Sequence, residues 1–243
     1  MRIGFFGGSF DPPHRGHIAL ALAAADRFAL DRVLLAPAGL QPLKERQTAT
    51  AFAHRYAMTA LAAQADPRLC PSLLDAPLPD RPNYTVETLT RLRDSLQVAG
   101  GQDTLFALVG ADSALEIGRW WRPDRLLTLC DWIVAARPGH AVGDIAAAVA
   151  AALPSGVQAE QAYDPVHGAY LRLRNSYGER SNLWALPEVQ ETVSATSLRA
   201  DIRNGAWDEA LAPPPVVEYV RKTGLYQATG EAPHWQQRQD TLR

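Results

Sequence analysis

The segment from residue 7 to residue 17 carries side chains suited to binding an anion. It reads Gly-Gly-Ser-Phe-Asp-Pro-Pro-His-Arg-Gly-His and follows a short apolar run, Arg2–Phe6, that is typical of a buried strand. Helix formers continue from His17 to Phe28, so the segment lies where a strand ends and a helix begins. Backbone N–H groups and the helix dipole are directed at an anion in such a turn. We therefore expect a phosphate site here.

The residue types in this turn support that expectation. Gly7 and Gly8 permit close approach of the backbone to a ligand, and Ser9 adds a hydroxyl. His14 and His17, three residues apart, can direct two imidazole donors to the same phosphate. The alternative is a proline-stiffened turn in which His14 is exposed and His17 only starts the helix. Zinc binding is a third interpretation, but no nearby Cys or His completes the three protein ligands of a catalytic zinc site.

A second group of residue types that could bind an anion lies near residue 194. Ser194, Thr196 and Arg199 lie at the start of a predicted helix, where hydroxyls, backbone N–H groups and a guanidinium can converge on phosphates. The alternative is a capped helix with a surface arginine, because Ser and Thr are favoured caps.

Asp112 and Gly110 directly follow a predicted buried strand, Thr104–Val109. Ligands of doubly wound sheets bind beyond the carboxyl ends of the strands, and a carboxylate there can accept hydrogen bonds from a ribose. Capping of the next short helix is the alternative role for Asp112, and both roles are compatible.

The composition limits the class of protein. With 243 residues, 47% of them hydrophobic and 21% charged, the chain can build a full core and is not dominated by disorder. Its net charge of −2 argues against a polyanion partner such as nucleic acid. Two distant cysteines, Cys70 and Cys130, are typical of buried thiols in a reducing compartment. Neither a signal peptide nor an apolar stretch of roughly 18 residues is found, so we expect a cytoplasmic protein without a membrane partner.

Apolar runs alternate with helix-forming stretches along most of the chain, which predicts an α/β fold with a doubly wound parallel sheet. Residues 154–182 show no period and are expected to form a long surface excursion. We expect one domain over residues 1–226, with a small C-terminal helical segment at about 194–226, and a disordered tail over 227–243. The expected strands are Arg2–Phe6, Asp31–Ala36, Leu69–Leu74, Thr104–Val109, Trp132–Ala136 and one within Leu183–Val193. The expected helices are His17–Phe28, Ala51–Ala65, Val86–Leu96 with Thr85 as its cap, a short one at Leu126–Leu129, Asp144–Leu153, Leu198–Arg203 and Val216–Lys222.

The ordered set of motifs resembles the nucleotidylyltransferase superfamily and, within it, the bacterial nicotinate-mononucleotide adenylyltransferases. Residues 7–17 are similar to the family's GG[ST]FDPxHxGH, and residues 82–89 resemble its PSYTxxTL. Further along, Gly110, Asp112 and Trp120 match a GxD…W segment, residues 137–139 an RPG, residues 194–199 an SxTxxR, and residues 219–226 a YIxxxGLY. The set is far more specific than any one motif.

The resemblance implies a Rossmann-like nucleotidylyltransferase that joins ATP and nicotinate mononucleotide in NAD biosynthesis. The 5′-phosphate of the mononucleotide would attack the α-phosphorus of ATP in line, giving deamido-NAD and pyrophosphate. Such a transfer depends on positioning and charge stabilisation, because the nucleophile is already an anionic oxygen. Mg²⁺ would be bound through the ATP phosphates, with no metal ligand from the protein. A homo-oligomer is compatible with the family.

The resemblance also implies roles for individual residues. His14, His17 and Arg199 would be catalytic. ATP would be bound by the catalytic three together with Gly7, Gly8, Ser9, Phe10, Lys44, Gly110, Asp112, Ser194 and Thr196.

Nicotinate mononucleotide would be bound by Tyr84, Thr85 and Trp120. The indole of Trp120 would stack on the pyridine ring, while Tyr84 and Thr85 would bring backbone and hydroxyl donors to the carboxylate. Core packing is the alternative for Trp120, although its neighbours Arg119 and Trp121 favour a partly exposed segment.

One departure from the family pattern affects the loop after the second strand. The family has PPH[KR] there, whereas this chain has Gln-Pro-Leu-Lys at residues 41–44. Leu43 replaces the histidine, and Lys44 remains available either to a phosphate or to solvent.

Overall fold

A computed structural model describes residues 1–40, 50–98, 103–135, 142–186, 189 and 193–227 of the chain. The strands are β1 (Arg2–Gly8), β2 (Arg32–Pro37), β3 (Leu69–Pro71), β4 (Thr104–Gly110), β5 (Asp131–Ala135), β6 (Val157–Asp164), β7 (Gly168–Asn175) and β8 (Arg180–Leu186). The α-helices are α1 (Arg15–Arg27), α2 (Phe52–Ala62), α3 (Thr85–Val98), α4 (Ala111–Leu115), α5 (Pro123–Leu126), α6 (Val142–Ala152), α7 (Ala195–Arg203) and α8 (Pro214–Thr223). Short 3₁₀ turns lie at Ala63–Ala65, Ile117–Arg119 and Glu209–Leu211.

The strands form one sheet in the order β3-β2-β1-β4-β5-β8-β7-β6. The first six in that order are parallel to their neighbours, and β7 and β6 are added antiparallel. The chain builds outward from β1 in one direction through β2 and β3, and in the other through β4 and β5. The strand order therefore reverses between β1 and β4, and the predicted doubly wound α/β sheet is confirmed. Ligands of such sheets bind where the order reverses, beyond the carboxyl ends of β1 and β4.

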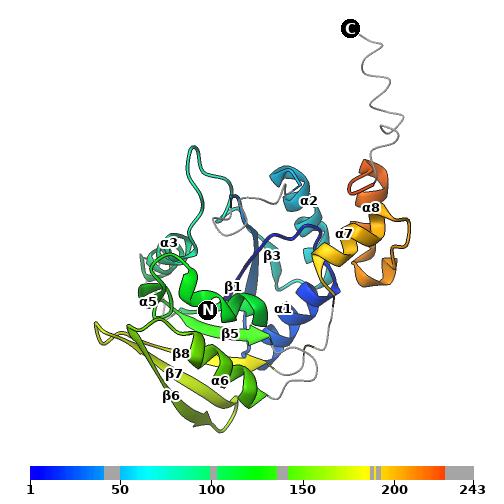
Figure 1. Cartoon of the computed structure of the whole chain (residues 1–243). Helices are drawn as coiled ribbons and strands as arrows, with labels where there is room; N and C mark the ends of the chain where they lie inside the picture. Colours follow the sequence, from blue (N-terminus) through cyan, green and yellow to red (C-terminus); the bar gives the residue numbers. More distant parts are fainter. Residues whose placement is uncertain (41–49, 99–102, 136–141, 187–188, 190–192, 228–243) are drawn as a thin grey trace, which may run out of the picture.

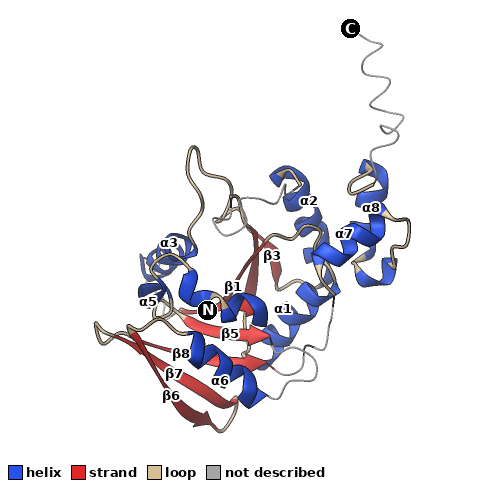
Figure 2. Cartoon of the chain, in the orientation of Figure 1, coloured by secondary structure: helices blue, strands red, loops and turns tan. Residues whose placement is uncertain are grey.

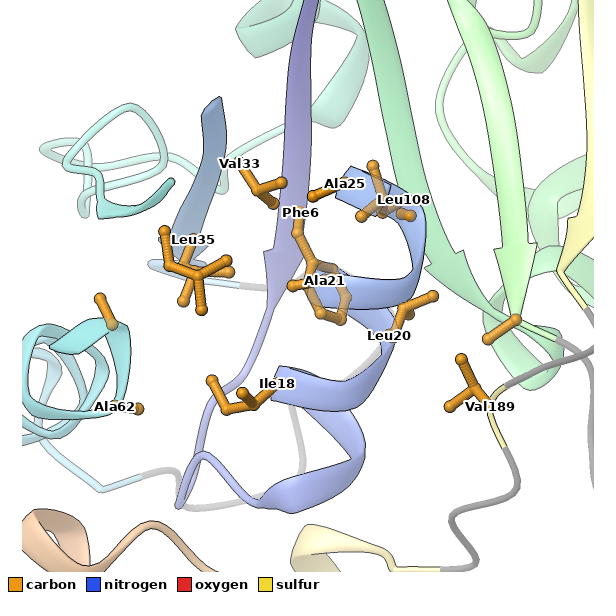
Figure 3. Close-up of a cluster of buried hydrophobic side chains, with 14 of the residues drawn as sticks. Phe6, Ile18, Leu20, Ala21, Ala25, Val33, Leu35, Ala62, Leu108 and Val189 are labelled. Atoms are coloured by element: carbon orange, nitrogen blue, oxygen red, sulfur yellow. The ribbon is translucent and has the colours of Figure 1, made fainter. Parts of the chain in front are cut away.

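Helices cover both faces of this sheet, as Figure 2 shows. Side chains alternate along β1, so Ile3 and Phe5 enter the core on one face and Phe6 the core on the other. Figure 3 shows the second core, in which Phe6 and Leu108 from the sheet pack against Ala21 of α1. Burial on both faces explains why the central strands read as continuous apolar runs.

The predicted C-terminal helical segment is confirmed as α7 and α8. Figure 1 shows both helices near α1 and α2, far from the β6–β7 hairpin. Val216 and Val220 of α8 are buried in the same core as Met58 of α2. Gly224 ends α8 in the left-handed conformation (φ 66°), as expected for a helix-ending glycine. This packing brings the C-terminal end of the described chain next to α1 and α2.

The prediction of a surface excursion over residues 154–182 is wrong. These residues form β6, β7 and the first part of β8. In β7 the side chains alternate, with Leu171 and Leu173 buried and Arg172 and Arg174 exposed, a period of two that the mixed composition obscured. Strand β6 lies at the sheet edge with one fully buried residue, Val157, so it carries almost no apolar pattern.

Several boundaries also differ from the sequence prediction. Strand β1 continues through both glycines, because Gly7 and Gly8 pair with Ala36 and Pro37 of β2. Helix α3 includes Thr85, so Thr85 does not cap it from outside.

Among the described residues, no helix is long and apolar enough to span a bilayer. The expected disordered tail lies, apart from residue 227, outside the described residues.

Candidate active site

The turn between β1 and α1 comprises residues 9–14 and is called the nucleotide loop below. Its backbone is pinned at both ends, because Gly8 pairs with β2 and His14 is the N-cap of α1. Within it, Phe10 has a positive φ of 46° and a side chain fully excluded from solvent. The Phe10 ring contacts those of Phe6 and His17 at centroid distances of 5.4 and 4.8 Å. Phe10 therefore anchors the loop in the core, which leaves only its backbone available for the predicted contact with ATP.

The structure brings His14 and His17 together. Their ring centroids lie 3.7 Å apart with an interplanar angle of 34°. The backbone N–H of His14 donates to Nδ1 of His17 at 3.2 Å. A ring nitrogen that accepts a hydrogen bond carries no proton, so Nε2 is the donor nitrogen of the His17 ring.

His14 is buried and electrically neutral. Its exposed fraction is 7%, and burial lowers its pKa to about 4. Its Nδ1 is buried and has no hydrogen-bond partner in the part of the chain that the structure describes. A buried polar atom left unpaired is unfavourable, and this nitrogen is therefore available for a hydrogen bond to a ligand. The alternative of an exposed His14 in a solvated turn is therefore wrong.

Asp11, in the middle of the nucleotide loop, is hydrogen-bonded to three other parts of the chain. Its Oδ1 accepts a hydrogen bond from the hydroxyl of Tyr226 at 2.6 Å, and its Oδ2 accepts one from the backbone N–H of Thr50 at 3.1 Å. Its backbone carbonyl accepts a third from Nη1 of Arg199 at 2.7 Å. Asp11 is only 3% exposed. Its carboxylate is thus engaged by the protein and serves as an anchor for the loop.

Arg55 of α2 is also hydrogen-bonded to this loop. It is 3% exposed, and it donates to the carbonyls of Ser9 (Nη1, 2.9 Å) and Thr50 (Nε, 2.9 Å). Burial lowers its pKa, while the nearby Asp11 acts in the opposite direction. The backbone carbonyl of Ser9 is therefore engaged by Arg55.

Helix α7 brings the second set of residues predicted to bind phosphate next to the nucleotide loop. Ser194 caps α7, its side chain accepting from the backbone N–H of Ser197 at 3.1 Å, so the capping alternative is confirmed for Ser194. Arg199 lies within hydrogen-bonding distance of Oγ1 of Thr196 (3.4 Å) in addition to its bond to Asp11. Residues almost two hundred positions apart in the sequence thus form one basic and polar surface beside the loop.

Gly110 and Asp112 lie at the carboxyl end of β4, the strand next to β1. Gly110 is the N-cap residue of α4 in extended conformation, and a side chain there would meet no atom within 4 Å. Asp112 is exposed in the first turn of α4. The sheet therefore places Asp112 at the reversal point, where the sequence predicted a ribose contact.

The residues predicted to bind the pyridine nucleotide lie around α3 and the segment after α4. Trp120 is partly buried and packs against the core, the alternative considered for it. Its neighbour Trp121 is 53% exposed and contacts the ring of Tyr84 at a centroid distance of 5.4 Å. Thr85 begins α3 directly after Tyr84. The structure thus brings an exposed indole to Tyr84, but it belongs to the residue after the predicted one.

Some predicted residues cannot be placed. Lys44, the substituted Leu43 and the segment 137–139 lie outside the described residues. Sequence reasoning also missed three residues that organise the site, namely Asp11, Arg55 and Tyr226, which were not among the predicted site residues. Asp11 and Tyr226 lie inside recognised motifs, whereas nothing in the local sequence around Arg55 marked it.

Comparison with known proteins agrees with this geometry. The sequence profile of cytidylyltransferase-like proteins matches residues 5–201. The chain belongs to the cytidylyltransferase-like family. The resemblance predicted from the motifs is confirmed by relatives named probable nicotinate-nucleotide adenylyltransferase. One from Thermoanaerobacter sp. is 30% identical over 95% of this chain and 97% of its own, and one from Acidothermus cellulolyticus is 33% identical over 94% and 95%.

Solved structures show the same fold in this family. A Plasmodium falciparum nicotinic acid mononucleotide adenylyltransferase complexed with NaAD superposes with a TM-score of 0.64 at 15% identity, covering 93% of this chain and 97% of that one. The same enzyme complexed with APC gives 0.62 at 16% identity, covering 93% and 96%. At this level of identity the likeness supports the Rossmann-like fold and nothing finer.

Proposed function

We propose that this protein transfers the adenylyl group of ATP to nicotinate mononucleotide, producing deamido-NAD and pyrophosphate in NAD biosynthesis. The observation that carries the proposal is the pair His14 and His17 at the reversal point of the sheet, with a buried, unpartnered Nδ1 on His14. The choice of nicotinate mononucleotide as the acceptor is inferred from the names of the family relatives. A 5′-phosphate oxygen of the mononucleotide forms a bond to the α-phosphorus of ATP. The bond from the α-phosphorus to the oxygen leading to the β-phosphorus breaks, and pyrophosphate leaves.

The two histidines act as neutral hydrogen-bond donors in this reaction. His14 is neutral at pH 7 because its pKa is about 4, and His17 carries its proton on Nε2. A negatively charged nucleophile needs no general base, so the role left for these groups is to stabilise charge on the α-phosphate and on the leaving pyrophosphate. Donors that are already fixed before the substrate arrives are the most effective for this purpose.

The remaining ATP contacts are assigned by position. Gly7, Gly8 and Ser9 line the end of β1 where the phosphates enter, and Ser194, Thr196 and Arg199 face them from α7. Gly110 and Asp112 at the end of β4 bind the ribose. On the acceptor side, Tyr84, Thr85 and Trp120 receive the nicotinate ring and its carboxylate.

Mg²⁺ accompanies ATP in this proposal. Among the described residues, no three His, Cys, Asp or Glu side chains gather as a metal cage. Mg²⁺ at nucleotide sites is bound mainly by phosphate oxygens and keeps several waters, so in this proposal its ligands come from ATP and solvent. When bound, it neutralises charge on the phosphates; the protein supplies the donors around them.

We also place the protein in the cytoplasm, with no nucleic acid or membrane partner, and a homo-oligomer is compatible with this function. Two free cysteines, Cys70 and Cys130, support a reducing compartment.

The deciding experiment offers purified protein ATP and Mg²⁺ with either nicotinate mononucleotide or nicotinamide mononucleotide. Pyrophosphate release and dinucleotide formation are followed in each reaction. We expect both products with the acid and much less with the amide. Preference for the amide would overturn the choice of acceptor. Absence of both products in both reactions would overturn adenylyl transfer to a pyridine nucleotide.

A further inference from the structure

Tyr226 connects the C-terminal end of the described chain to the centre of the nucleotide loop. Its hydroxyl donates to Oδ1 of Asp11 at 2.6 Å and lies 3.9 Å from the sulfur of Met58. The backbone at Tyr226 has a φ of 68°, a conformation that L side chains adopt only when their surroundings enforce it. Tyr226 lies outside the range matched by the family profile, residues 5–201. A residue that lies in a separate element and yet reaches the loop is a candidate for controlling the loop.

We propose that Tyr226 is a positioning residue that acts through Asp11 to hold His14 in place for adenylyl transfer. This inference rests on the proposed function and deepens it. Asp11 lies midway between Gly8 and His14, the two fixed ends of the loop.

The contacts of Asp11 explain why the Tyr226 hydroxyl matters. The loop centre is held at three atoms of Asp11, each from a different part of the chain: Thr50 before α2, Arg199 on α7, and Tyr226 after α8. Without the hydroxyl, Oδ1 of this 3% exposed carboxylate loses the partner described here. A buried carboxylate oxygen without a partner is strongly unfavourable, so the loop shifts to hydrate it. A shift at Asp11 changes the angle at which the chain enters α1 at His14, three residues on, and so turns the His14 ring away from its position.

The hydroxyl of Tyr226 stays protonated at working pH. Burial raises its pKa most, and the negative charge of Asp11 raises it further. Tyr226 therefore remains a donor to Asp11 across the range in which the enzyme is assayed, and the contact does not switch with pH.

Tyr219 provides a matched control. It lies on α8, and its hydroxyl makes a 2.8 Å hydrogen bond to Nδ1 of His54 on α2. Both tyrosines thus tie the C-terminal segment to the body of the protein through one hydroxyl. Only Tyr226 ties it to the nucleotide loop. Substitution by Phe removes the same group at both positions and keeps the ring.

The test compares Tyr226→Phe with Tyr219→Phe in the full chain. Loss of a hydrogen bond to a charged group predicts a fall in kcat of about tenfold to a hundredfold for Tyr226→Phe. The KM for nicotinate mononucleotide should stay unchanged, because the hydrogen-bond partners of Asp11 in the described chain are Thr50, Arg199 and Tyr226 rather than Tyr84, Thr85 or Trp120. Tyr219→Phe should change kcat by less than about twofold, because the hydrogen bond that it removes does not reach the loop. Thermal unfolding of both variants measures how much stability each substitution removes from the fold.

A double-mutant cycle with His14→Ala identifies the route. If Tyr226 acts through His14, adding Tyr226→Phe to His14→Ala should lower kcat by less than about twofold more. Equal losses of kcat in both backgrounds, or equal losses for the two tyrosine variants, would overturn the proposal. Wild-type protein without activity on nicotinate mononucleotide would instead overturn the proposed function, which separates the two failures.

Discussion

The two sides of the candidate site are built differently. On the ATP side, the nucleotide loop is largely buried, and its Ser9 and Asp11 are hydrogen-bonded to Arg55, Thr50 and Arg199. On the acceptor side, the exposed Trp121 and the half-buried Tyr84 meet through ring contact. The first side is preorganised, as charge stabilisation requires. The second offers aromatic surface, which selects a ligand by shape and stacking.

The largest effect should come from His17→Ala on the ATP side. Removal of one preorganised donor predicts a fall in kcat of about 10²–10³-fold with the fold intact. Steady-state rates of pyrophosphate release check the first part, and circular dichroism checks the second. His54→Ala removes a histidine from α2 and serves as the control. A His17 variant with near-normal turnover would remove His17 from this role.

The buried, neutral His14 predicts a pH dependence of stability. Its pKa is about 4 in the folded protein and near 6.5 when unfolded, so between these values the unfolded chain binds the extra proton. The contribution of neutral His14 to the free energy of unfolding is therefore fully present above pH 6.5. It is lost as the pH falls toward 4, by about 3 kcal/mol.

Denaturant unfolding of wild type and His14→Gln at pH 4.5 and 7.5 measures this difference. We expect the variant to lose less stability than wild type between the two pH values. Burial raises the pKa of Asp75 and Asp131, whose effect has the opposite sign but is common to both proteins. The same pH dependence in both proteins would contradict a buried, neutral His14.

A smaller effect is expected on the acceptor side. Trp120→Ala should raise the KM for nicotinate mononucleotide about tenfold, as expected for loss of an aromatic stack, with little change in the KM for ATP. Trp121→Ala is the matched comparison, because it removes an indole that is 53% exposed from the next position. Equal weakening of both substrates by Trp120→Ala would indicate that Trp120 serves packing, consistent with its contact with the core.

The smallest effect should come from Thr85→Val, which keeps the shape and the backbone N–H but removes the hydroxyl. Loss of one hydroxyl donor to the carboxylate, at a partly exposed position where water can replace it, predicts a decrease of about fivefold in the preference for the acid over the amide acceptor. The ratio of kcat/KM values for the two mononucleotides measures it. An unchanged ratio would limit recognition of the carboxylate to backbone groups and to other residues.

Much of the ATP side could be predicted because its residues are close in the sequence. The strand, glycines and histidines of residues 2–17 carry a local pattern whose geometry follows from the strand-to-helix turn. Arg55 and Tyr226 could not be assigned in this way, because their partners Ser9 and Asp11 lie 46 and 215 positions away. The β6–β7 hairpin was missed for another reason, since an edge strand with one fully buried residue has little apolar pattern.

The sequence by itself determined the α/β class, the strand-to-helix phosphate turn and the family, because each depends on local order along the chain. Only the tertiary structure decided that His14 is buried with an unpartnered Nδ1, and that Asp11 is an anchor for the loop. It also decided that Trp121 rather than Trp120 meets Tyr84. These features depend on which distant segments pack together, and burial and partner choice are properties of the folded chain that no local pattern encodes.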